Sequence, residues 1–487
     1  MQQFSRIVAR NSAFGIAAQL AIKVLSFGFT VLIVRQLGAA DFGQYAAVLA
    51  FGGLFVFIAD LGLSPYAVRE VARWRDAPNG PAQVSELFGN LLTLRFLLAL
   101  LAAVLLIATA WLTGRPPVMI GAIALGTLGL IMYSVQGTSD SMLAGFERLD
   151  MSSGAKVLYQ AIFVSIGALA LLIGYGYYGL IGANLIGIAL MTVACWRGAR
   201  WLGLRPGRAN PAGWPALLRA SVPFGIIGFT LGLSYKFDSV LLNIFRGDTE
   251  TGYYNAAYNL VFATAVLSNV INTALYPSLT RQAATGPEAL PAIYARTLRY
   301  LMVLALPIAV GAATLADQIV PFLFKAAYLP AVPALQMVIW VVPLMYCSEF
   351  LGYVVLIRGQ ERSAARAIVT STTVNVLLNL VLVPLYGFVG AAIMTVITEA
   401  ILVGQYSWML RTEMRQLDWG NIVLRPLLAA LLMGGTVLAL RSLPLLLNIV
   451  IGALVYGVLL ILLGVVGREE LRFVRSLRRS ADAVIVR

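Results

Sequence analysis

The chain has 487 residues, of which 60% are hydrophobic and only 11% are charged, and its mean hydropathy is +0.86. Soluble domains carry about 25% charged residues, so this composition excludes an ordinary soluble enzyme. The formal net charge is +14, and the absence of histidine excludes imidazole bases and histidine metal ligands.

Continuous apolar runs, each long enough to cross a membrane, recur from Asn11 to Gly464. A helix needs about 20 apolar residues to cross a hydrocarbon core of about 30 Å. The runs therefore predict an all-α polytopic membrane protein with about fourteen transmembrane helices. In chain order the predicted spans are 12–35, 43–64, 88–112, 117–137, 155–174, 178–197, 221–245, 253–276, 299–323, 332–357, 364–385, 388–410, 425–441 and 444–466. After the second span, PYAVREVARWRD predicts an amphipathic helix at the membrane surface.

The basic residues favour one face of the membrane. If the spans alternate in direction, 27 of the 35 Lys and Arg residues fall at the N-terminus, in every second connection or in the C-terminal tail. The positive-inside rule places this face, with both termini, in the cytoplasm. We therefore expect a multi-pass protein of the cytoplasmic (inner or plasma) membrane. Because topology accounts for the positive charge, we expect no nucleic-acid partner.

Short motifs recur in the same order about 210 residues apart, which predicts an internal repeat. The pairs are DFGQYAA from Asp41 with ETGYYNAA from Glu250, Pro65 and Arg69 with Pro277 and Arg281, GFER from Gly145 with GQER from Gly359, and YGLIGA from Tyr178 with YGFVGA from Tyr386. Their offsets are 209, 212, 214 and 208 residues. Spans 1–6 and 7–12 are thus predicted to be two copies of one unit.

Six spans are an even number, so the two copies have the same orientation, as in transporters with parallel repeats. We predict an N-terminal lobe at 1–210 and a C-terminal lobe at 211–418, arranged around a central cavity. Two extra helices at 419–466 and a basic cytoplasmic tail at 467–487 fall outside the repeat. Because substrates of such folds bind at the repeat interface, the repeat favours a transporter over a receptor, channel or scaffold.

Two lysines lie near the middle of corresponding spans, Lys23 in span 1 and Lys236 in span 7. A charge at the bilayer centre costs about 2.5–3.5 kcal/mol, so such residues usually have a function. Two ammonium groups at similar depth would replace the hydration of an anionic phosphate or diphosphate. The alternatives are a buried lysine–aspartate network that locks the lobes together, and lysines that reach for the interface.

Four acidic residues are candidates for ion coupling or for a cavity network: Asp60, Asp238, Glu349 and Glu399. Carboxylates inside spans commonly bind Na⁺ or H⁺ in coupled transport. A hydrogen bond between helices is the competing interpretation for each of them. We expect no other cofactor and no metal site, since Cys195 and Cys347 both fall in apolar spans.

Two Glu-Arg pairs end spans on the predicted cytoplasmic face: Glu147 with Arg148, and Glu361 with Arg362. They could form an intracellular gate, or they could anchor the topology. The sequence has no Walker A motif, no metal-ligand spacing and no nucleophile–base pair, so we expect a transporter without a catalytic site.

Several stretches resemble one transporter family. They are LNLVLVPLYGFVGAAIMTVITEA from Leu378, ADLGLSPYAVREVAR from Ala59, MLAGFERLDM from Met142 and DSVLLNIFRGDTETGYYNAAYNLV from Asp238. Together they resemble the polysaccharide transporter family, the O-antigen or lipid-linked oligosaccharide flippase type of the multidrug/oligosaccharidyl-lipid/polysaccharide exporter superfamily. The fourteen spans and the two six-span lobes agree with this resemblance.

The resemblance implies a flippase. Such a protein moves a polyprenyl-diphosphate-linked oligosaccharide from the cytoplasmic to the outer leaflet by alternating access, with coupling to an ion gradient in several relatives. It also implies contact with membrane lipids, with a polysaccharide polymerase and with glycosyltransferases. Three alternatives stay open: a flippase of the peptidoglycan lipid precursor, a cation-coupled multidrug antiporter of the same superfamily, and a non-transporting membrane scaffold for polysaccharide assembly.

Overall fold

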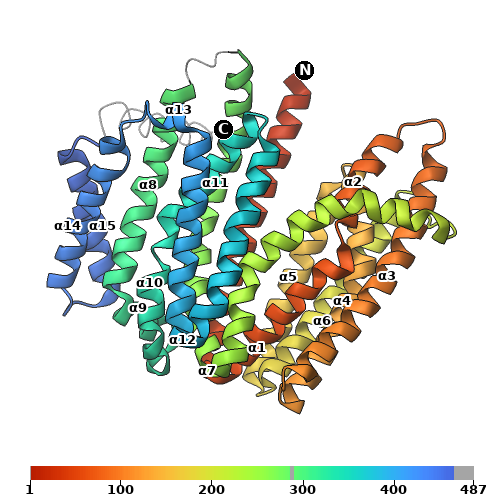
Figure 1. Ribbon diagram of the computed structural model, residues 1–487, viewed down its shortest axis with the longest axis horizontal. Coiled ribbons are helices and arrows are strands. Elements are labelled where there is room, and N and C mark those ends of the chain that lie inside the picture. The colour runs from red at the N-terminus through yellow and green to blue at the C-terminus, as the bar shows by residue number, and fades with distance from the viewer. Residues whose placement is uncertain (1, 286–289, 466–487) are drawn as a thin grey trace, which may run out of the picture. The chain divides into compact units, whose positions relative to one another are not determined.

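The computed structural model describes residues 2–285 and 290–465, and these residues are almost entirely helical. The main helices are α1 (Gln2–Asp60), α2 (Leu63–Trp74), α3 (Gly80–Leu112), α4 (Pro117–Gly145), α5 (Leu149–Leu172), α6 (Gly176–Trp201), α7 (Trp214–Thr285), α8 (Leu290–Thr314), α9 (Ala316–Phe324), α10 (Val332–Val338), α11 (Val341–Ile357), α12 (Glu361–Met409), α13 (Arg411–Met414), α14 (Arg425–Ala439) and α15 (Leu445–Leu462) (Figure 1). No β-strand occurs in these two ranges, which confirms the all-α prediction.

Three helices are far longer than one membrane crossing, with 59 residues in α1, 72 in α7 and 49 in α12. Each contains a single glycine that leaves helical geometry: Gly38 at φ 75°, Gly247 at φ 84° and Gly387 at φ 58°. Positive φ strains residues with a Cβ atom but not glycine. Each long helix therefore consists of two arms that meet at a glycine, at the places where the sequence predicts a boundary between spans.

The predicted spans fall on helix throughout the described ranges, apart from span ends and short breaks. Within those ranges nine helices are long and apolar enough to cross a membrane, or up to eleven if two bent pairs each count as one span. This count takes α12 as one helix and α1 from Ile22 as one helix, although each has two arms. The protein is thus a multi-pass helical membrane protein, while the number fourteen stays a prediction.

The amphipathic segment after span 2 forms α2. Leu63, Ala67 and Val71 recur at helical spacing and are fully buried. They share a hydrophobic cluster with Phe88 and Leu91 of α3. Because one face of α2 is fixed in this way, the helix holds the connection between α1 and α3 in one position.

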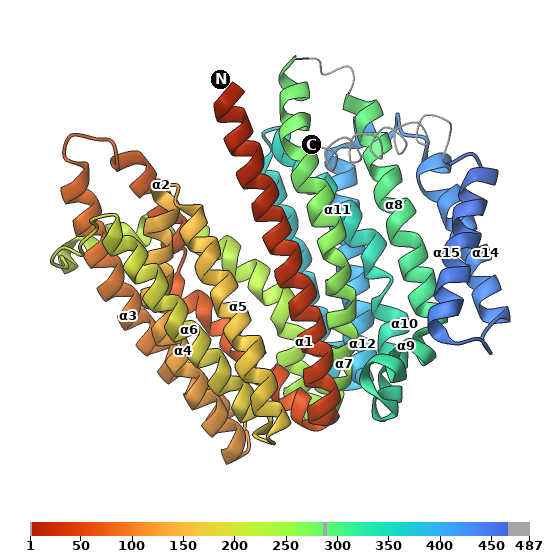
Figure 2. The same cartoon turned by 180° about the vertical axis from the view of Figure 1, so that it is seen from behind.

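The helices form two compact units. Within the described residues, unit 1 consists of residues 2–259 with Ile368–Met394, and unit 2 consists of residues 260–285, 290–367 and 395–465. This division differs from the lobes at 1–210 and 211–418, which stay predictions from the repeat. In unit 1, α3, α4, α5 and α6 pack side by side, as both views show (Figures 1 and 2).

In unit 2, the two extra C-terminal helices pack against α8 (Figure 2). A Cβ atom on Gly434 of α14 would lie 2.7 Å from Val310 of α8, so this glycine allows a close approach. The Tyr456 hydroxyl of α15 donates to the Val303 carbonyl of α8 over 3.0 Å. The predicted spans 13 and 14 are therefore an integral part of unit 2.

Candidate functional site

The main candidate site is a cavity of about 220 Å³ within unit 1. Its walls come from both arms of α1, from α5 and from α7. The lining residues are Ser26, Phe29, Thr30, Ile33, Phe42, Tyr45, Ala46, Leu49, Gln160, Phe163, Lys236, Asn255 and Asn259. Hydroxyl and amide groups, which both donate and accept hydrogen bonds, share this lining with aromatic rings and a lysine.

Lys236 supplies the positive charge of this cavity, and its side chain is exposed to it. A Cβ atom on Gly53 would lie 3.5 Å from Lys236 Cγ, so the aliphatic stem packs on the second arm of α1. Among the described residues Lys236 forms no ion pair. Asp238 accepts hydrogen bonds from other groups instead, so this geometry does not support a Lys236–Asp238 lock.

Lys23 lies on the helix face that meets the cavity, but it is not part of the lining. Residues three and seven positions apart share one face of a helix, and Ser26 and Thr30 line the cavity. Lys23 therefore sits one turn away along this face, toward the start of α1, and its side chain is exposed.

Asp238 is buried deeper in α7, with 3% of its surface exposed. It accepts a hydrogen bond from the Tyr254 hydroxyl over 3.0 Å and one from Asn379 Nδ2 over 2.7 Å. Asn379 is fully buried, and its Oδ1 has no hydrogen-bond partner. A buried carboxylate beside an unsatisfied amide oxygen is an arrangement that suits a hard cation.

Asp60, at the end of α1, forms an ion pair with Arg95 of α3. Arg95 Nη2 lies 2.7 Å from Asp60 Oδ1, and Ser64 Oγ donates to the same oxygen over 2.6 Å. Arg95 is 1% exposed, and a Cβ atom on Gly137 would lie 2.6 Å from its Nη2. Because Arg95 already compensates the Asp60 charge, this geometry favours a structural role for Asp60 over ion coupling.

We expect Asp60→Asn to destabilise the protein by about 3–5 kcal/mol, because it leaves a buried guanidinium without its counter-charge. The measurement is the unfolding midpoint of the purified protein in detergent. Asp60→Leu/Arg95→Met, which removes both charges, is the matched control and should lose much less stability. Equal losses in the two variants would contradict the ion-pair interpretation.

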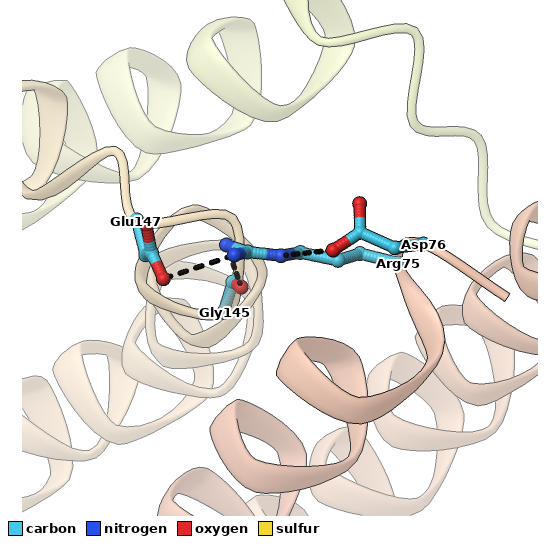
Figure 3. A network of polar contacts seen from close by, with 4 residues as sticks. All are labelled: Arg75, Asp76, Gly145 and Glu147. Carbon is cyan, nitrogen blue, oxygen red and sulfur yellow. Dashed lines mark hydrogen bonds and ion pairs between the residues drawn. The ribbon is translucent and has the colours of Figure 1, made fainter.

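The side chains of the predicted gate residues Glu147 and Arg148 do not pair with each other. Each forms an ion pair with another residue. Arg75, directly after α2, donates to Glu147 Oε1 over 3.0 Å, to the Gly145 carbonyl over 3.4 Å and to Asp76 Oδ2 over 3.2 Å (Figure 3). The Glu147 and Asp76 carboxylates raise the pKa of the Arg75 guanidinium above its usual value. The network links the end of α2 to the end of α4, which fits an anchor within unit 1.

Arg148 pairs instead with Asp150, at 2.9 Å, and its guanidinium lies 5.0 Å from the ring centroid of Trp201. In unit 2, Glu361 and Arg362 start α12 and are both exposed. The ion pairs of Glu147 and Arg148 are thus with residues of unit 1, while Glu361 and Arg362 lie in the first turn of α12 in unit 2.

Glu349 and Glu399 lie together in unit 2. Ser268 Oγ donates to Glu349 Oε2 over 2.6 Å, and Asn272 Nδ2 lies 3.5 Å from the same oxygen. Glu399 accepts a hydrogen bond from Ser348 and is within electrostatic range of Glu349. Among the described residues neither carboxylate forms an ion pair with a basic side chain. Two acidic groups with only neutral donors are suited to hold a proton.

The two arms that extend beyond the breaks of α1 and α7 cross in direct backbone contact within unit 1. A Cβ atom on Gly43 would lie 1.7 Å from the Asp248 carbonyl oxygen, and one on Gly252 would lie 2.0 Å from the Ala39 carbonyl oxygen. Gly43 and Gly252 are 209 residues apart, as are Ala39 and Asp248. The contact is thus made twice, by corresponding residues of the predicted repeat.

A polar network that sequence reasoning missed surrounds this crossing. Asp248 accepts from Gln44 Nε2 over 2.9 Å and from Asn243 Nδ2 over 2.7 Å. Arg115, between α3 and α4, donates to the side chain of Asn243 over 2.6 Å and to its carbonyl oxygen over 2.7 Å. The sequence does show one signal for this network: Asp248 follows a glycine in the short connection between the predicted spans 221–245 and 253–276.

Residues 8–282 match the family model described as "Polysaccharide biosynthesis protein". "Probable low-salt glycan biosynthesis flippase Agl15" of Haloferax volcanii is 22% identical over 396 residues, which is 81% of each chain. "Probable flippase AglR" of the same organism is 23% identical over 418 residues, again 81% of each chain.

Solved structures show the same fold. "Lipid II flippase MurJ, inward closed conformation" aligns with a TM-score of 0.78 at 14% identity, over 92% of this chain and 98% of that chain. An inward-facing multidrug resistance MATE family transporter of the MOP superfamily aligns with a TM-score of 0.58 at 13% identity, over 83% of this chain and 100% of that chain. Both alignments show that the chain has the fold of these two transporters.

Proposed function

Because this chain belongs to the polysaccharide biosynthesis protein family, we propose that it is a flippase for a lipid-linked glycan. Its substrate is a polyprenyl-diphosphate-linked oligosaccharide, which moves from the cytoplasmic to the outer leaflet of the cytoplasmic membrane. Agl15, named as a glycan biosynthesis flippase, supports a glycan as the cargo, and AglR, named as a flippase, supports the transport activity. The observation that carries the proposal is the exposed Lys236 side chain in a cavity of unit 1 that is lined by polar and aromatic groups.

The chemistry of the cavity suits the phosphorylated part of such a lipid. A diphosphate must lose water to enter, and a fixed ammonium in a low-dielectric site replaces that hydration. The amides of Gln160 and Asn259 can bind phosphate oxygens or sugar hydroxyls, whereas the Asn255 amide already bonds to Thr251 and Ser239. At about 220 Å³ the cavity is smaller than the roughly 300–1,000 Å³ of drug-sized sites, so it holds the linkage and not the whole glycan.

Transport by alternating access requires a closed end that can open. In our proposal the crossing at Gly43 and Gly252 closes the predicted outer end of the pathway. The close backbone contact and the hydrogen bonds of Asp248 support this assignment. Glycosyltransferases that build the glycan and a polymerase that consumes it are the expected partners on the two sides.

The test of this function is a sidedness assay in proteoliposomes. A polyprenyl-diphosphate oligosaccharide is placed in the inner leaflet, and its accessibility to an external glycan-modifying enzyme is followed. Protein-dependent exchange is the expected result. Exchange of a peptidoglycan precursor alone would favour that substrate, since it has the same diphosphate linkage. Efflux of a cationic dye without lipid exchange would favour a multidrug antiporter, and neither activity would favour a scaffold.

We further propose that transport is coupled to Na⁺ at Asp238 and Asn379. The carboxylate and the unsatisfied Asn379 Oδ1 supply the oxygen ligands that this ion prefers. We expect Asp238→Asn to raise the Na⁺ concentration for half-maximal exchange at least ~10-fold, since each 1.4 kcal/mol of lost binding is about tenfold. The measurement is the exchange rate under imposed Na⁺ gradients.

Glu349→Gln is the matched control for this variant, because it neutralises a carboxylate in unit 2 and leaves Asp238 in place. It should keep the Na⁺ response. A lost response to an H⁺ gradient in Glu349→Gln, with an unchanged Na⁺ response in Asp238→Asn, would assign coupling to the proton and reject the Na⁺ site.

A further inference from the structure

A second cavity, of about 240 Å³, lies in unit 1 between the second arm of α1 and helices α3, α4 and α6. Apolar side chains such as Val48, Leu106, Ile123 and Ile188 form most of its wall. Gly52, Gly53, Gly126 and Gly129 also line it. A Cβ atom on Gly52 would meet no atom within 4 Å, so the absence of a side chain at this position leaves space open.

This apolar cavity adjoins the cavity that contains Lys236. Tyr45 and Leu49 line both of them. Gly53 lines the apolar cavity while Lys236 packs against it, with Lys236 Cγ, Cδ and Cε at 3.5, 3.8 and 3.8 Å from a Cβ atom built on Gly53. A cavity that contains a positive charge and amide groups therefore lies directly beside an apolar cavity.

We propose that the apolar cavity binds the hydrocarbon directly bonded to the diphosphate, that is, the first isoprene units of the lipid carrier. This inference rests on the proposed function, because it takes the Lys236 cavity as the diphosphate site. In such a lipid the hydrocarbon is bonded directly to the charged diphosphate. The two parts can therefore occupy two adjoining cavities, the diphosphate beside Lys236 and the hydrocarbon in the apolar cavity. Apolar cavities of about 150 Å³ bind benzene, so about 240 Å³ accommodates an isoprene unit.

The proposal makes the protein selective for the group that is bonded to the phosphate. In a prenyl diphosphate this group is a hydrocarbon, whereas in a diacyl phospholipid it is glycerol with polar ester groups. Those polar groups would lose their hydrogen bonds with water among Val48, Leu106 and Ile123. Membrane phospholipids are therefore poor competitors, although they are abundant around the protein.

The test is a binding experiment with the full-length protein in detergent and three probes: geranyl diphosphate, inorganic diphosphate and a short-chain phosphatidic acid. We expect Gly52→Leu to weaken geranyl diphosphate binding at least ~10-fold, because the leucine fills the apolar cavity (1.4 kcal/mol is about tenfold). Binding of inorganic diphosphate should not change. Lys236→Gln should weaken binding of both diphosphates.

Gly126→Leu, which fills the same cavity from α4, is the second variant in case Gly52→Leu does not fold. Gly154→Leu on α5 is the matched control, because a Cβ atom there also meets nothing within 4 Å and the residue lines neither cavity. Unchanged geranyl diphosphate binding in folded Gly52→Leu and Gly126→Leu would overturn the inference, as would phosphatidic acid that binds as tightly as the prenyl probe. Diphosphate binding that Lys236→Gln leaves intact would instead overturn the proposed function.

Discussion

Replacing Lys236 with alanine is expected to reduce lipid exchange between leaflets by roughly 30-fold or more while leaving the unfolding midpoint nearly unchanged. Truncating one partner of a desolvated charge pair costs about 2–5 kcal/mol of binding, and each 1.4 kcal/mol is about tenfold. Stability should be spared because Lys236 has no ion-pair partner in the described ranges, so no protein carboxylate loses its counter-charge. The measurement is the initial rate in the sidedness assay.

Two further variants sharpen this experiment. Lys236→Arg keeps the charge on a larger, planar group and should retain part of the activity. Lys325→Ala removes an exposed lysine outside the cavity and should retain all of it. If well-folded Lys236→Ala exchanged the lipid at the normal rate, the cavity would not be the diphosphate site.

Adding a side chain at the crossing of α1 and α7 is expected to have the second large effect. Gly43→Val and Gly252→Val each place a Cβ atom about 2 Å from a backbone oxygen, which cannot move aside as a flexible side chain can. Overpacking of this kind costs typically 1–3 kcal/mol, so both variants should disfavour the closed crossing and lose transport. Because the two contacts correspond, we expect similar losses.

Disulfide cross-linking measures the closed crossing directly. Gln44 and Asp248 are joined by a side-chain hydrogen bond, so Gln44→Cys/Asp248→Cys reports their approach once Cys195 and Cys347 have been replaced. The cross-linking yield should fall in the Gly43→Val background and persist with Gly28→Ala, where a Cβ atom meets nothing within 4 Å. Full cross-linking and full transport in Gly43→Val would show that a side chain fits at this position, which would contradict the prediction.

Much of the fold could be predicted because membrane crossing imposes apolar runs of a set length. Apolar runs do not determine whether the helix ends between two spans, as the long helices α1 and α7 show. The connections before Asp41 and Glu250 contain no cluster of helix-breaking residues, so the helix continues and bends at one glycine. A span count from apolar runs and a count of continuous helices therefore differ.

The sequence predicts how deep in the membrane a candidate side chain lies, but it does not predict toward which neighbours that side chain points. The position of Lys236 within its span gives its depth, whereas its exposure to a cavity depends on the rotation of α7. Arg95 was missed for the same reason. An arginine inside an apolar span is visible in the sequence, but its partner Asp60 is identified only when α1 packs on α3.

The contacts at Gly43 and Gly252 have the pattern of an isologous interface, in which residue i of one subunit meets residue j of the other and the reverse also holds. Such reciprocity arises between identical chains around a two-fold axis. In a six-helix homodimer, one substitution would alter both contacts at once. When the two copies are joined in one chain, a substitution in one copy changes only one of the two contacts. In the predicted repeat Ala39 and Asp248 occupy corresponding positions. Ala39 has a methyl group there, whereas Asp248 has the carboxylate that accepts hydrogen bonds from Gln44 and Asn243.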